Sequence, residues 1–249
     1  MIATAHGSRT DSSGQLVRLL AAGAAAGLLI GLLLSWSWFD SGQGTTVSVL
    51  GAGSSVTVLI SHDQRRVLIA SGTNGAEFSN AISDVLPPLG DEIDVLLIHP
   101  AASPDVIERA RRLDHRRLMM LPDPDGDSTL ETIQESFQIS LGEDIQLSLR
   151  VGPDLDWAAT LDVAGSRVLI TPHGSPVRTV TASVWIILEG GPEPIASMSS
   201  AITIGPAGGT DETITRHVVI ASGEVASMTL DDGRISMPAS LIDDPGSDQ

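Results

Sequence analysis

The strongest constraint on this chain is an uncharged run of 21 residues from Leu19 to Phe39. An α-helix of that length, rising about 1.5 Å per residue, would span about 30 Å, the thickness of a bilayer core. Arg9 and Arg18 precede the run and Asp40 follows it. The positive-inside rule therefore predicts a single-pass protein of the cell membrane, with residues 1–18 as a short cytoplasmic N-terminus and the main domain outside the cytoplasm.

A cleaved signal peptide is the main alternative to an anchor, with Ser35 and Ser37 as the small residues of the cleavage site. Cleavage there would place bulky Trp36 and Trp38 around the cut, and the apolar run is long for a signal peptide. Tryptophan rings at one end of the run are instead typical of the headgroup region. We therefore expect an uncleaved transmembrane helix over residues 19–39, while the sequence leaves N-terminal processing open.

Three glycines, Gly23, Gly27 and Gly31, recur at every fourth position of the expected membrane helix. Such spacing forms a smooth ridge that lets another helix approach closely. The partner would be a second copy of this chain, giving a homodimer, or another membrane protein. Small residues are also common in membrane helices that make no such contact.

The charge balance excludes several functions for the domain. The chain has 14 basic and 31 acidic residues, a formal charge of −17, and all of its basic residues are arginine. Because nucleic-acid affinity depends on basic side chains that displace counterions, DNA or RNA binding is disfavoured. The absence of cysteine excludes disulfides, thiol nucleophiles and thiolate metal sites. Either a salt-adapted surface or a GC-rich genome would explain the lack of lysine.

The rest of the chain divides into a linker at residues 40–46, a domain at 47–240 and a flexible polar tail at 241–249. Apolar runs with flanking turn residues predict strands over Val47–Leu50, Val56–Ile60, Val67–Ala70, Ile93–Ile98, Leu118–Leu121, Ile145–Val151, Trp157–Val163, Val168–Thr171, Val184–Leu188, Ala201–Ile204, Val218–Ala221 and Val225–Leu230. Helical spacing predicts helices over Ala76–Leu86, Asp105–Leu113 and Thr129–Phe137. This order favours an α/β layered sandwich.

The order of elements and several turns resemble the C-terminal metallo-β-lactamase-fold domain of ComEC-type DNA-uptake channel proteins. The family turn D-V-G-Q-G-D aligns with Val49–Ser54, which keeps both glycines and neither carboxylate. The family's Asp-Gly-Gly aligns with the end of Val67–Gly72, which keeps only the last glycine. The metal motif H-P-D-A-D-H aligns with His99–Pro104, in which the first His and the Pro remain.

Two later motifs of the family align with Thr171–His173, where His replaces a bridging carboxylate, and with Leu188–Pro192, which has no His. Ile202–Gly209 resembles the family's strand and glycine turn, and Val225–Met237 its closing hairpin. The resemblance covers about Thr45 to Met237. It implies a metallo-β-lactamase-like αββα sandwich preceded by one N-terminal transmembrane helix.

The missing ligands have a chemical consequence. Hydrolysis by this fold needs a metal, held by several His and carboxylate side chains, that lowers the pKa of its bound water to about 7. Only one His remains in the main motif, so we expect a pseudoenzyme without a metal or other cofactor. The alternative is a rearranged metal site in which His99, His173 and Glu189 face the same cavity.

Other candidate sites have simpler interpretations. Asp123, Asp125 and Asp127 resemble a calcium loop, but the glycine position and the missing twelfth-position Glu do not fit an EF-hand. An arginine cluster could bind phosphate, although pairing with the acidic surface is simpler; it comprises Arg109, Arg111, Arg112, Arg116 and Arg117. Three isolated histidines are interpreted as surface or edge residues without partners: His62, His115 and His217.

Three functions remain open from the sequence. The first is a non-catalytic, membrane-anchored binding or scaffold domain outside the cytoplasm, whose partner is a protein and whose context is DNA uptake or the cell envelope. The second is a metal-dependent hydrolase, such as a phosphodiesterase, using His99, His173 and Glu189. The third is a structural spacer without a saturable partner.

Overall fold

The computed structural model describes residues 44–86, 92–122, 132–152, 157–173, 182–190, 200–205 and 217–238. The predicted membrane helix with its glycines Gly23, Gly27 and Gly31 lies outside these ranges, as does the aspartate turn at 123–127. In the described ranges, no helix combines the length and the apolar character needed to cross a bilayer.

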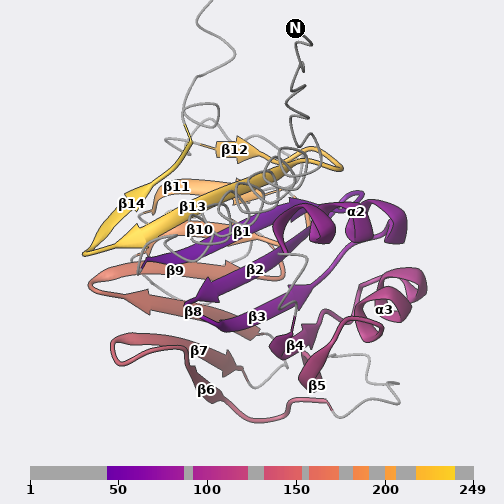
Figure 1. Cartoon of the computed structure of the whole chain (residues 1–249), viewed down its shortest axis with the longest axis horizontal. Coiled ribbons are helices and arrows are strands. Elements are labelled where there is room, and N and C mark those ends of the chain that lie inside the picture. The colour runs from indigo at the N-terminus through magenta and orange to yellow at the C-terminus, as the bar shows by residue number, and fades with distance from the viewer. Residues whose placement is uncertain are drawn as a thin grey trace, which may run out of the picture. The chain divides into compact units, whose positions relative to one another are not determined.

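The described residues form two seven-stranded mixed sheets (Figure 1). The first has the order β14-β13-β1-β2-β3-β4-β5. Its strands are β1 Thr45–Gly51, β2 Val56–His62, β3 Arg65–Ala70, β4 Ile93–Ile98, β5 His115–Met120, β13 Val225–Asp231 and β14 Arg234–Ser236. The second has the order β12-β11-β10-β9-β8-β7-β6. Its strands are β6 Phe137–Ser140, β7 Ile145–Val151, β8 Trp157–Val163, β9 Ser166–Thr171, β10 Ala182–Ile187, β11 Ser200–Gly205 and β12 His217–Val219.

Short turns join antiparallel strands that follow one another in the chain. The β13–β14 hairpin turns at Asp232-Gly233, with φ angles of 44° and 75°, and the β8–β9 hairpin turns at Ala164-Gly165, with 45° and 90°. Two-residue hairpins favour this left-handed geometry because it matches the twist of the flanking strands. Parallel strands need longer crossovers, and helices provide them between β3, β4 and β5.

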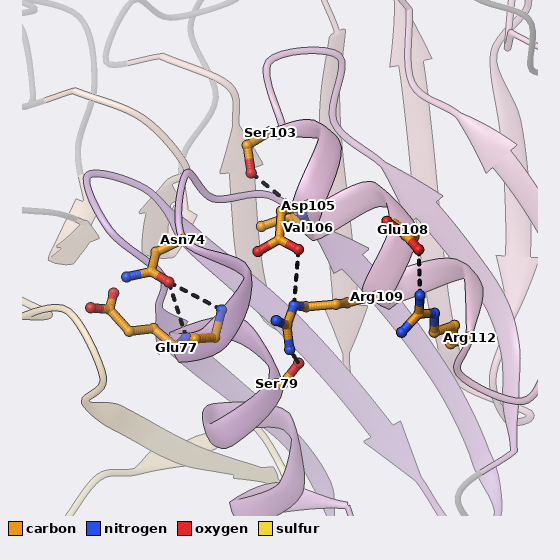
Figure 2. A network of polar contacts seen from close by, with 10 residues as sticks. Asn74, Glu77, Ser79, Ser103, Asp105, Val106, Glu108, Arg109 and Arg112 are labelled. Carbon is orange, nitrogen blue, oxygen red and sulfur yellow. Dashed lines mark hydrogen bonds and ion pairs between the residues drawn. The ribbon is translucent and has the colours of Figure 1, made fainter.

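Helices α2 (Gly75–Val85) and α3 (Pro104–Arg111) are these crossovers, and each begins at a side-chain cap. Asn74 Oδ1 accepts hydrogen bonds from the backbone N–H groups of Ala76 and Glu77, and Ser103 Oγ accepts one from Val106 (Figure 2). Capping of this kind satisfies amide groups that have no partner inside the helix. Both helices lie on the same face of the first sheet (Figure 1).

Alternating side chains of the first sheet fill two separate cores. Val67 and Ile69 of β3 pack toward the second sheet, in the same cluster as Leu161 and Ile170, whereas Leu68 packs with the helices. Since successive strand residues point to opposite faces, a strand covered on both sides must be apolar throughout. This explains the apolar run Val95–Ile98 of β4 and gives a helix, sheet, sheet layering. Mixed sheets with few helices fit the metallo-β-lactamase-like fold that the sequence predicts.

The predicted helix over Thr129–Phe137 is wrong for its described part. Thr132 forms a parallel bridge with Met120, and the N–H of Ile133 donates to the carbonyl of Met120 at 2.9 Å. Phe137 then begins β6, whose inward Phe137 and Ile139 pack on the core between the sheets. Burial against the core and pairing with β7 override the helical spacing of the segment.

Candidate functional site

The candidate site lies where strand ends of the two sheets meet. Ser71 follows β3 and His99 follows β4 of the first sheet, whereas His173 and Glu189 follow β9 and β10 of the second. Within each pair the strands are parallel, so their carboxyl ends lie at one edge of the sheet. A backbone hydrogen bond also joins the two sheets here. The N–H of Val56 donates to the carbonyl of Leu188 at 2.9 Å.

His99 is buried, with 2% of its surface exposed. Its Nδ1 atom lies 3.3 Å from Oε1 of Glu189 and 3.3 Å from the backbone nitrogen of Ala101. The ring also meets Trp157 edge-on, with 5.8 Å between the ring centroids and an interplanar angle of 61°. The N–H of His99 donates to the carbonyl of Ala70 at 2.9 Å, which fixes the residue beside β3.

Three side chains lie close to one carboxylate oxygen of Glu189. Oε1 lies 3.4 Å from Ser71 Oγ, 3.5 Å from Ser55 Oγ and 3.3 Å from His99 Nδ1. Burial favours the protonated acid and by itself raises the pKa of Glu189. The hydrogen bond from His99, the charges of His99 and His173, and the Ser71 hydroxyl outweigh burial, so the pKa of this carboxyl lies below its ordinary value.

His173 reaches the same edge without direct contact to the pair. Its ring is exposed, and it acts on Glu189 through its charge. Its carbonyl accepts a hydrogen bond from Thr171 Oγ1 at 2.8 Å, and Thr171 Oγ1 in turn accepts one from Trp185 Nε1 at 2.9 Å. The structure therefore brings His99, His173 and Glu189 together, with only His99 and Glu189 touching.

These residues do not fit a metal centre that holds several ligands. Among the described residues, no group of three or more His, Asp or Glu side chains is arranged to hold a metal ion. Nδ1 of His99 already faces Glu189 and Ala101. Ser103, where the resembled family has a carboxylate, caps α3 through its hydroxyl, and the methyl group of Ala101 is no metal ligand.

Beside this site, the turn around Gly53 is held by two side chains that the sequence interpretation missed, those of Glu77 and Ser222. The N–H of Gly53 lies 3.0 Å from Glu77 Oε2 and 2.8 Å from Ser222 Oγ, and Ser222 Oγ also donates to Glu77 Oε2. Asn followed by Glu three positions later marks a helix start, so the sequence could have placed Glu77 in the first turn of α2. Nothing in the sequence signals Ser222, which is 145 residues away from Glu77.

Ion pairs engage three of the five clustered arginines. Arg109 pairs with Asp105 at 3.2 Å and donates to Ser79 Oγ at 3.0 Å, which links α3 to α2, and Arg112 pairs with Glu108 (Figure 2). Arg116 contacts Glu92 at 2.7 Å and Asp94 at 3.1 Å. Its hydrogen bond lowers the pKa of Glu92. For these three residues, the predicted pairing with the acidic surface is confirmed.

Two of the isolated histidines also have partners, contrary to the sequence interpretation. His62 Nε2 lies 3.5 Å from Asp63 Oδ2, and His62 Nδ1 lies 3.4 Å from Thr45 Oγ1. Nδ1 of His115 donates to the carbonyl of Leu113 at 2.7 Å. Both rings serve local contacts at strand ends, away from Glu189.

Comparison with protein-family models finds no matching family, and no curated protein matches this chain. Among solved structures, the metallo-β-lactamase fold protein YhfI from Bacillus subtilis is 10% identical, with a TM-score of 0.43 over 75% of this chain and 100% of that one. Zinc-bound PqqB from Methylobacterium extorquens is 12% identical, with a TM-score of 0.35 over 58% of this chain and 70% of that one. MEM-A1, a subclass B3 metallo-β-lactamase from a soil metagenome library, is 14% identical, with a TM-score of 0.38 over 55% of this chain and 64% of that one. The architecture assigned to this chain follows from its own sheet order and layering.

Proposed function

We propose that this protein is a membrane-anchored, non-catalytic domain of metallo-β-lactamase-like fold that acts outside the cytoplasm as a binding or scaffold module. One observation carries the non-catalytic part. The side chains that remain at the candidate site satisfy one another, with His99, Ser71 and Ser55 around one oxygen of Glu189. A hydrolytic metal centre needs ligands that are free to coordinate and a position open to water.

The proposal also includes a membrane helix as the anchor and a protein as the partner. The uncharged run from Leu19 to Phe39 supports a membrane helix, and the ridge of Gly23, Gly27 and Gly31 supports contact with a second copy or another membrane protein. The formal charge of −17 favours a protein partner over a nucleic acid. The resemblance to ComEC-type proteins makes DNA uptake or envelope assembly the context to examine first.

A metal-dependent hydrolase is the second candidate, and one observation favours it. His99, His173 and Glu189 lie at the same edge, close enough for the charges of both histidines to lower the pKa of Glu189. In this alternative, the exposed His173 swings toward Glu189 and a metal ion joins the three side chains. The substrate class would be phosphodiesters.

Hydrolysis of an activated phosphodiester separates the two candidates. The full-length protein is incubated with bis-p-nitrophenyl phosphate and with zinc or manganese, beside the His99→Ala variant and a variant of the remote histidine, His115→Ala. The non-catalytic proposal predicts that all three proteins give the rate of metal in buffer alone. A metal-dependent rate that survives His115→Ala and disappears in His99→Ala would establish the hydrolase instead.

Membrane fractionation tests the anchor. Full-length protein should stay in the membrane pellet after extraction at alkaline pH and enter the soluble fraction only with detergent, because a buried apolar helix does not depend on charge for its attachment. A variant with Leu29 and Leu33 both replaced by Arg is the control and should lose membrane insertion. Release of the unaltered chain by alkali alone would contradict the anchor.

A further inference from the structure

Three side chains from different segments of the first sheet converge on one residue of the second. Ser55 precedes β2, Ser71 follows β3 and His99 follows β4, whereas Glu189 follows β10. Ser55, Ser71 and His99 are 3%, 0% and 2% exposed. All of them approach the same atom, Oε1 of Glu189, at 3.3 to 3.5 Å.

Burial makes this shared acceptor important. A polar group that is removed from water without a hydrogen-bond partner destabilises the folded state, and an ionised acceptor forms stronger bonds than a neutral one. The lowered pKa of Glu189 agrees with an ionised carboxylate at neutral pH. One carboxylate oxygen thus accepts from two buried serines of the opposite sheet and lies beside Nδ1 of His99, which also faces the N–H of Ala101.

Contacts with neighbouring segments hold both serines in place. Thr57 Oγ1 donates to the carbonyl of Ser71 at 2.6 Å and accepts from the N–H of Ser71 at 3.1 Å. Ser55 and Glu189 form an antiparallel bridge, next to the bond from Val56 to Leu188. The side-chain cluster therefore lies where the two sheets are already joined by main-chain hydrogen bonds.

We infer that Ser55, Ser71, His99 and Glu189 form an inter-sheet clasp, in which a carboxylate fastens the two sheets at the edge where the fold family implies a metal. The inference rests on the proposed function, because both require that no metal occupies this edge. It assigns Glu189 a positioning role: the residue holds three segments of the first sheet against β10, and it touches no substrate.

Thermal unfolding of the full-length protein tests the clasp. Glu189→Ala, Glu189→Gln and the control Glu143→Ala, an exposed glutamate between β6 and β7, are followed by circular dichroism in EDTA and in zinc. We expect Glu189→Ala to lower Tm by roughly 4–8 °C more than the control, equally in both conditions, and Glu189→Gln to lower it less. Hydrogen exchange at the Val56 amide should also become faster in Glu189→Ala.

The outcomes separate failure of the clasp from failure of the proposed function. If Glu189→Ala unfolds and exchanges like the Glu143→Ala control, and zinc changes neither protein, the clasp is wrong and the non-catalytic proposal stands. If zinc raises the Tm of the unaltered protein and Glu189→Ala removes that increase, the edge is a metal site and both are wrong.

Discussion

Glu189 concentrates the electrostatics of the candidate site in a single side chain. Its carboxylate lies partly buried between the sheets, yet the hydrogen bonds and charges around it keep the pKa below the ordinary value of 4.5. A group whose pKa is depressed by folding stabilises the native state fully above its unfolded pKa, and it loses that contribution as the pH falls through the folded pKa. The stability of this protein should therefore respond to acid through Glu189.

The pH dependence of Glu189→Gln tests this expectation. At about pH 5, the variant should have a lower Tm than the unaltered protein, because the charged form of Glu189 is present there. The deficit should shrink below about pH 4.5, as Glu189 becomes protonated in the unaltered protein. Glu143→Gln corrects for the general effect of acid. A deficit that stays constant or grows below pH 4.5 would contradict the depressed pKa.

Among the individual residues, sequence reasoning reached some members of the site and missed others. The motif alignment placed His99, His173 and Glu189 at one cavity, and the structure brings all three to one edge. Ser55 was not singled out, because its contact with Glu189 spans 134 residues and the chain gives no local signal of it. Ser71 appeared only at the position of the first glycine in the family's Asp-Gly-Gly, although its hydroxyl has its own role beside Glu189.

At the scale of elements, short apolar runs with flanking turn residues predicted most of the described strands. The runs Ile145–Val151 and Trp157–Val163 coincide with β7 and β8, and the closing hairpin appears as β13 and β14. The edge strands were less visible. β5 begins at His115 and includes the exposed Arg116 and Arg117, which an edge strand tolerates but which carry no apolar signal.

The turn between β1 and β2 offers a prediction about a single glycine with a matched control. Gly53 and Gly223 have nearly identical φ angles, 81° and 80°. A methyl group at Gly53 would lie 2.0 Å from Thr73 Oγ1, whereas one at Gly223 would meet nothing within 4 Å. Both substitutions to alanine incur the strain of a positive φ, so their difference isolates the crowding.

We expect Gly53→Ala to lower the free energy of unfolding by about 1–3 kcal/mol more than Gly223→Ala, because Thr73 must move away. The displaced Thr73 would also weaken its contact with the N–H of Ser54, at 3.3 Å. Urea unfolding of the two full-length variants measures the difference. Equal destabilisation would mean that the turn is free to adjust and does not depend on Thr73.

For the whole molecule, three properties support the proposed function. An uncharged N-terminal run predicts an anchor, an acidic surface disfavours nucleic acid, and the joined edges of two sheets hold side chains that satisfy one another. In the proposed function, the protein contributes surfaces for a partner, and the joined edge around Glu189 contributes stability. We therefore expect this edge to bind no metal.

The metal content of the purified protein tests this expectation. The full-length protein is incubated with excess zinc and manganese, separated from free metal, and examined by elemental analysis beside His99→Ala and Glu189→Ala. We predict well under one equivalent of metal in all three proteins, because His99 and Ser71 already contact Glu189 in the unaltered chain and each variant lacks one candidate ligand. One or two equivalents in the unaltered protein, lost in both variants, would contradict the account and make the protein a metal-dependent hydrolase candidate.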